Sequence, residues 1–169
     1  MKYQTTYFDI SNKNESNLFD FFMGSLIEPV YNSCKKGKIK LLPFFKQGNE
    51  GYLVSYLAST LVEFVFYENR IKNIEKLRKI MEENETKQTR NLFYDFLLFK
   101  SQGDEILLNK GLFKKGYSDY LGSRFYFQAS QIRMKIDHRA TPLSLALRNI
   151  SFYFNEFSEI LHEAYKNLR

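Results

Sequence analysis

Apolar residues recur three and four positions apart along most of the chain, which is the spacing of one face of an α-helix. The first such stretch predicts a helix over residues 17–31, and the polar residues 11–16 are suited to cap it. Pro29 is expected to kink or shorten the end of this helix. Residues 34–50 contain two glycines and a proline and predict a loop.

The middle of the chain repeats the helical spacing. A long helix is predicted over residues 52–81. A compact, largely buried helix follows from Leu92, and Gly103 is expected to end it. Residues 104–109 predict one short helical turn, and residues 111–116 predict a basic loop.

Two amphipathic stretches close the chain. Ser118 is a good N-cap for the first of them, whose apolar face extends to Ile136. The second has Thr141 as N-cap and Pro142 at the first helical position, and its apolar stripe extends to Leu168 in alternating steps of four and three. Such a stripe packs along a neighbouring helix at a shallow angle. The pattern therefore predicts an all-α fold, a compact bundle of about five main helices that ends in a C-terminal antiparallel helix pair.

Length and composition add limits to this picture. The 169 residues fit one domain over 1–169, and only 8 glycines and 3 prolines disfavour a turn-rich β fold. Cys34 is the single cysteine and there are two histidines, so we expect neither an intramolecular disulfide nor a zinc site. No secretory signal or membrane-length apolar run is recognised. We therefore expect a cytoplasmic protein without cofactor, metal or membrane contact.

The chain has a net charge of +6 and a pI of about 9.2. A basic surface favours a polyanionic partner, such as RNA or another nucleic acid. A charge of this size also fits solubility alone. The lysines at positions 35, 36, 38 and 40 are interpreted as part of a solvated loop, and His162 as a surface or packing residue.

One short segment between the two C-terminal stretches contains residues suited to chemistry. Arg133 lies five positions before His138, and Lys135 and Arg139 lie beside them. Cleavage of RNA by its own 2′-OH needs proton transfer and a cation on the phosphate, which histidine and arginine can supply, with Lys135 and Arg139 attracting phosphates. In a continuous helix the two positions would lie about 140° apart. Cooperation therefore requires the helix to unwind near Asp137, or two subunits to share the site.

An Arg-x4-His motif near a helix end, followed by a short break and another amphipathic helix, resembles the HEPN superfamily (higher eukaryotes and prokaryotes nucleotide-binding domain). The resemblance covers residues 118–169. It implies a homodimer in which Arg133 and His138 form a composite, metal-independent RNA-cleaving site. The family usually has a polar residue directly after the arginine, where this chain has Met134.

The sequence leaves other hypotheses open. The protein could be an inactive or nucleotide-binding relative, or the motif could be coincidental. A different class is a non-enzymatic basic helical subunit or adaptor that binds nucleic acid or a protein partner in a larger assembly, such as a defence complex. A third class is a viral or bacterial effector that works by protein contact alone.

Overall fold

The computed structural model describes residues 15–42, 50–66, 79, 82–83, 91–114 and 119–167. These residues form helices joined by turns and irregular segments, without a strand among them. The helices are α1 (Glu15–Lys35), α2 (Glu50–Phe66), α4 (Leu92–Phe113), α5 (Asp119–Asp137), α6 (Pro142–Phe152) and α7 (Phe154–Asn167). The predicted all-α bundle is confirmed, with six helices in the described part of the chain instead of about five.

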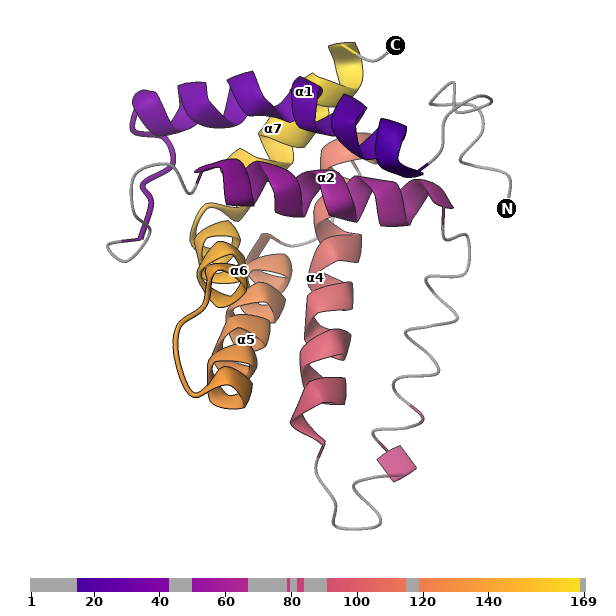
Figure 1. Cartoon of the computed structure of the whole chain (residues 1–169), viewed down its shortest axis with the longest axis vertical. Coiled ribbons are helices and arrows are strands. Elements are labelled where there is room, and N and C mark those ends of the chain that lie inside the picture. The colour runs from indigo at the N-terminus through magenta and orange to yellow at the C-terminus, as the bar shows by residue number, and fades with distance from the viewer. Residues whose placement is uncertain are drawn as a thin grey trace.

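The helices enclose one apolar core (Figure 1). α5 packs between α4 and α6, α1 packs against α2, and α7 contacts α4 and α1. In Figure 1, α1 and α2 lie across one end of α4. Each helix contributes large side chains that are almost fully buried, among them Phe22, Leu57, Leu107, Tyr126, Leu147 and Phe157. The predicted C-terminal antiparallel pair is formed by α5 and α6, with Thr141 as N-cap and Pro142 in the first turn of α6, whereas α7 packs mainly against α4.

Two helix ends in the first half of the chain differ from the prediction. α1 continues to Lys35, beyond Pro29. Leu26 and Val30 on either side of the proline are fully buried, and this packing offsets the hydrogen bond that proline cannot donate. Of the helix predicted over 52–81, the structure describes residues 52–66 as part of α2. Residues 67–78, 80 and 81 lie outside the described part of the chain, as do residues 43–49 of the predicted loop.

The prediction that Gly103 ends a helix is wrong. α4 continues through Gly103 to Phe113 and ends at Lys114, whose φ of 49° is left-handed. Gly103 is buried, and a Cβ added there would lie 3.1 Å from the ring of Tyr126. The glycine therefore serves close packing of α4 against α5, and residues 104–113 extend the helix. Ser118 lies outside the described residues.

The final predicted helix is divided into α6 and α7 at Tyr153 (φ −121°, ψ 38°). Neither glycine nor proline marks this position, but contacts with α5 lie on both sides of it. Before the break, the hydroxyl groups of Ser123 and Ser151 each donate a 2.7 Å hydrogen bond to the other residue's carbonyl oxygen. After it, the ring of Phe154 lies so close to Gly122 that a Cβ there would be 2.3 Å from the ring.

A buried carboxylate connects three helices inside the core. Asp104 of α4 is fully buried. It accepts 2.6 Å hydrogen bonds from the hydroxyl groups of Tyr56 on α2 and Tyr126 on α5. It also forms an ion pair with Lys100, at 2.9 Å. A carboxylate is stable in a core only when such donors replace water. The requirement fixes the rotation of α5 against α4 and α2.

We expect Tyr126→Phe to lower the free energy of unfolding by about 1.5–3 kcal/mol, because a hydrogen bond to a buried charged group is lost. Urea denaturation measures the change. Tyr120→Phe is the matched control: Tyr120 is on the same helix and 71% exposed, so its change should stay within about 0.5 kcal/mol. Equal effects of the two substitutions would contradict the role given to the Asp104 cluster.

Candidate functional site

The helix that carries the Arg-x4-His segment ends near Asp137, where one of the two ways for Arg133 and His138 to cooperate places a break. α5 ends at Asp137, and His138 has a φ of 55°, in the left-handed region. Histidine enters this region more readily than most residues. The side chains of His138 and Arg139 are exposed, and Thr141 then starts α6. His138 therefore lies in a turn, outside the helical register of Arg133.

Arg133 is held by two neighbours. Its Nε and Nη2 atoms donate hydrogen bonds of 2.7 and 2.9 Å to the two carboxylate oxygens of Asp137, one helical turn further on. Its Cζ lies 5.4 Å from the ring centre of Phe96 on α4. A two-point arginine–carboxylate pair is among the stronger polar contacts in proteins. The guanidinium is therefore oriented by α4 and by the end of α5.

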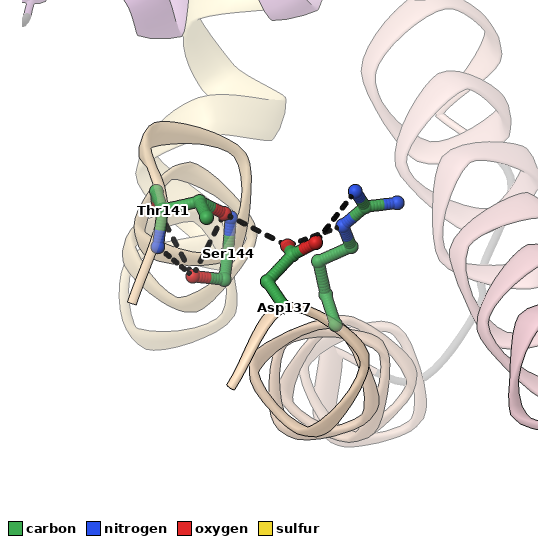
Figure 2. Close-up of polar contacts among 4 residues, drawn as sticks. Asp137, Thr141 and Ser144 are labelled. Atoms are coloured by element: carbon green, nitrogen blue, oxygen red, sulfur yellow. Dashed lines mark hydrogen bonds and ion pairs between the residues drawn. The ribbon is translucent and has the colours of Figure 1, made fainter. Parts of the chain in front are cut away.

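Asp137 also connects the two helices of the pair. The Thr141 hydroxyl donates to an Asp137 oxygen at 3.4 Å. Thr141 and Ser144 form a reciprocal cap: the Thr141 N–H donates to the Ser144 hydroxyl at 2.8 Å, and the Ser144 N–H donates to the Thr141 hydroxyl at 3.3 Å. Figure 2 shows Asp137, Thr141 and Ser144 linked in this way between α5 and α6. The contacts fix the start of α6 next to the end of α5.

Positive charge is concentrated on this helix pair. The pair, residues 119–152, contains five lysines and arginines and two acidic residues, Asp119 and Asp137, which gives a net charge of +3 out of +6 for the chain. The five cations are Arg124, Arg133, Lys135, Arg139 and Arg148. Among the described residues only Arg133 of these five has an ion pair. Arg124, Lys135 and Arg139 are exposed. The pair therefore presents cations that remain available to an anion.

The charge state of Asp137 follows from its contacts. The hydrogen bonds from Arg133 are the main reason that the pKa of Asp137 lies below its ordinary value, and partial desolvation only partly opposes this. Asp137 is therefore an anion at neutral pH. It competes with any phosphate for the guanidinium of Arg133.

The remaining candidate groups offer less chemistry. Within the residues that the structure describes, no three His, Cys, Asp or Glu side chains are grouped to hold a metal ion. Burial, followed by the charge of Glu50, raises the pKa of the Cys34 thiol, which reduces the population of the nucleophilic thiolate. His162 is half-buried, and its Nδ1 lies 3.1 Å from the Gly111 carbonyl oxygen. No helix in the described ranges is both long and apolar enough to cross a bilayer.

The structure places the four residues singled out in the sequence at one end of the α5 and α6 pair. Lys135, His138 and Arg139 are exposed there, and Arg133 is turned towards α4. Sequence reasoning missed the role of Asp137, although its i,i+4 spacing from Arg133 is typical of a helical ion pair. Comparison with models of protein families, with curated proteins and with solved structures finds no match.

We expect Arg133→Gln to raise the pKa of Asp137, because the main cause of the lowering is removed. In the parent, the lowered pKa stabilises the folded state at pH values above the unfolded pKa of about 3.9, and this contribution is lost as the pH falls through the folded pKa. Carbon-detected NMR titration of the Asp137 carboxyl group measures its pKa in the folded parent and in the folded variant. Lys135→Gln removes a nearby charge that does not bond to Asp137 and should leave its pKa almost unchanged. A similar rise in both variants would contradict the assignment.

Proposed function

We propose that the protein binds single-stranded RNA through the outer surface of the α5–α6 hairpin, defined as residues 119–152. The observation that carries the proposal is the net charge of +3 on this hairpin, where both acidic residues are already paired, Asp119 with Lys110 and Asp137 with Arg133. Basic groups that neutralise phosphates and release counterions supply most of the affinity of such surfaces. The resemblance of Arg133 and His138 to the HEPN motif supports RNA as the polyanion.

The register of α5 supports a continuous binding face. Arg124, Gln131 and Lys135 are exposed, and with Phe127 they follow one another at three- and four-residue steps, so they share one side of the helix. Arg139 extends the row of cations beyond the helix end. An RNA strand that follows this face would meet His138 at the end of α5.

The proposal predicts a charge-specific and salt-dependent interaction. In the double variant with Arg124→Gln and Lys135→Gln, binding of a fluorescent oligouridine should weaken. The slope of log affinity against log salt is negative, and it should become less negative by about 0.7 for each phosphate contact removed. Fluorescence anisotropy over a salt series measures both effects.

The matched control removes the same charge at the end of α1. Lys36 and Lys38 are exposed, and the double variant with Lys36→Gln and Lys38→Gln should keep the parent slope. If this control loses binding and the α5 variant binds as the parent does, RNA binds beside the end of α1 and the proposal is contradicted.

A second proposal is that the same surface cleaves RNA in a homodimer. It is supported by the break that frees His138 from the register of α5. His138 would accept the proton of the 2′-OH as that oxygen attacks phosphorus, the bond from phosphorus to the 5′-oxygen would break, the 5′-oxygen would take a proton from water, and a 2′,3′-cyclic phosphate would form. Arg133 would hold the phosphate, which requires its guanidinium to exchange the Asp137 carboxylate for phosphate oxygens. Arg133 and His138 of one site would come from different subunits.

Cleavage by this route should depend on one of the two histidines. His138→Ala should reduce cleavage by about 100-fold or more, the usual contribution of a general acid or base. His162→Ala is the control, because His162 contacts Gly111 and lies outside the hairpin. Gel analysis of RNA products in the presence of a chelator measures the rates, and circular dichroism and sedimentation check fold and assembly.

The same experiment separates the enzyme from a non-enzymatic subunit. Equal cleavage by the parent and His138→Ala would end the catalytic assignment. Salt-sensitive binding without turnover in the parent would favour the adaptor class, in which the hairpin holds RNA inside a larger assembly and His138 has no chemical role.

A further inference from the structure

Two aromatic rings and an arginine form a group on the outer surface of the α5–α6 hairpin, away from the Arg-x4-His segment. Phe127 of α5 and Phe152 of α6 have ring centres 6.1 Å apart, with an angle of 36° between their planes. The Cζ of Arg148 lies 5.0 Å from the ring centre of Phe127. We call these three residues the aromatic platform.

The platform lies outside the apolar core. Phe152 is 55% exposed at the last position of α6, whereas Leu147 and Ile150 on the same helix are fully buried. Single exposed apolar residues are common on protein surfaces. Here two rings are in contact and an arginine is stacked on one of them, so that the exposed ring is held in a defined place.

Arg148 has a cationic group without an anion. Its Nε is buried and has no hydrogen-bond acceptor among the described residues. The two acidic residues of the hairpin are engaged elsewhere: Asp119 pairs with Lys110, and Asp137 is bonded to Arg133 and Thr141. A guanidinium that is oriented by a ring and lacks a carboxylate is suited to a phosphate oxygen or to the face of a base.

The platform also continues the basic face of α5. Phe127 lies three residues after Arg124 and eight residues before Lys135, at spacings that keep all three on one side of the helix. The distance from Phe127 to Lys135 along the helix is about 12 Å. A strand in contact with Lys135 can therefore extend along α5 to the platform without leaving the basic surface.

We propose that the aromatic platform is a stacking site for one base of a single-stranded RNA, with Phe152 against the base and Arg148 and Arg124 at the adjacent phosphates. The inference rests on the proposed RNA binding and adds to it where a base is held. Stacking on an aromatic side chain is the common way in which single-stranded nucleic acids are bound without sequence readout. The guanidinium of Arg148 on Phe127, which has no carboxylate partner among the described residues, favours this occupant over an apolar partner surface.

The test compares four single variants in binding to a fluorescent oligouridine. Phe152→Ala should weaken binding by about 5- to 150-fold, the usual effect of losing one stacked base. Phe152→Tyr retains a ring and should bind as the parent does, whereas Phe152→Leu retains apolar surface without a ring and should be as weak as Phe152→Ala. Phe21→Ala removes a ring that is 39% exposed on α1 and should have no effect.

Two further measurements separate stacking from charge. Phe152→Ala should keep the parent salt slope, because no phosphate contact is lost. It should also bind inorganic polyphosphate, which has no bases, as tightly as the parent does. Parental binding of oligouridine by Phe152→Ala or by Phe152→Leu would overturn the stacking site.

The outcomes also distinguish this inference from the proposal on which it rests. A parent protein that does not bind oligouridine overturns both. If the parent binds oligouridine in a salt-dependent way and Phe152→Ala binds it with the same affinity, only the stacking site on the platform is overturned. If sedimentation shows that Phe152→Ala loses a dimer and that RNA affinity falls only in step with this loss, the rings are a contact between copies and the stacking site is overturned.

Discussion

The carboxylate of Asp104 determines how α5 is rotated, and the surface of the hairpin follows from that rotation. Tyr126 must face inward to donate to Asp104. At about 100° per residue, Arg124 then lies about 160° and Lys135 about 180° away from Tyr126 around the helix, so both face solvent. Arg133 lies within about 20° of the direction of Tyr126, which turns its guanidinium towards Phe96 on α4. One buried charge thus divides the cations of α5 into outward and inward groups.

Much of the fold could be predicted from the sequence, because helix formation follows local apolar spacing and capping. Thr141 and Pro142 start α6 as predicted. The errors arose where a distant residue decides the local outcome. Gly103 continues a helix because the ring of Tyr126 needs the space that a side chain would occupy. The break at Tyr153 has no glycine or proline of its own and is accompanied by contacts with Ser123 and Gly122 on α5. Spacing along one helix cannot reveal such partners.

The candidate site was predictable in part. For Arg133 and His138 to cooperate, their spacing required either a break near Asp137 or a site shared by two subunits, and the structure has a break there. The pairing of Arg133 with Asp137 could have been anticipated from their i,i+4 spacing, but the contact with Phe96 depends on how α4 packs. The aromatic platform left no periodic signal, because Phe127 and Phe152 are far apart in sequence and meet only when the hairpin closes.

Under the proposed function, binding and cleavage would draw on different cations. Arg124 and Lys135 face solvent and can meet a phosphate without any rearrangement. Arg133 cannot, because both carboxylate oxygens of Asp137 occupy it, and the lowered pKa keeps that carboxylate charged at neutral pH. A phosphate would therefore gain Arg133 only by displacing an internal anion. Under the proposal, RNA binding would need only the exposed cations of a single chain, whereas cleavage would also need the release of Arg133 from Asp137.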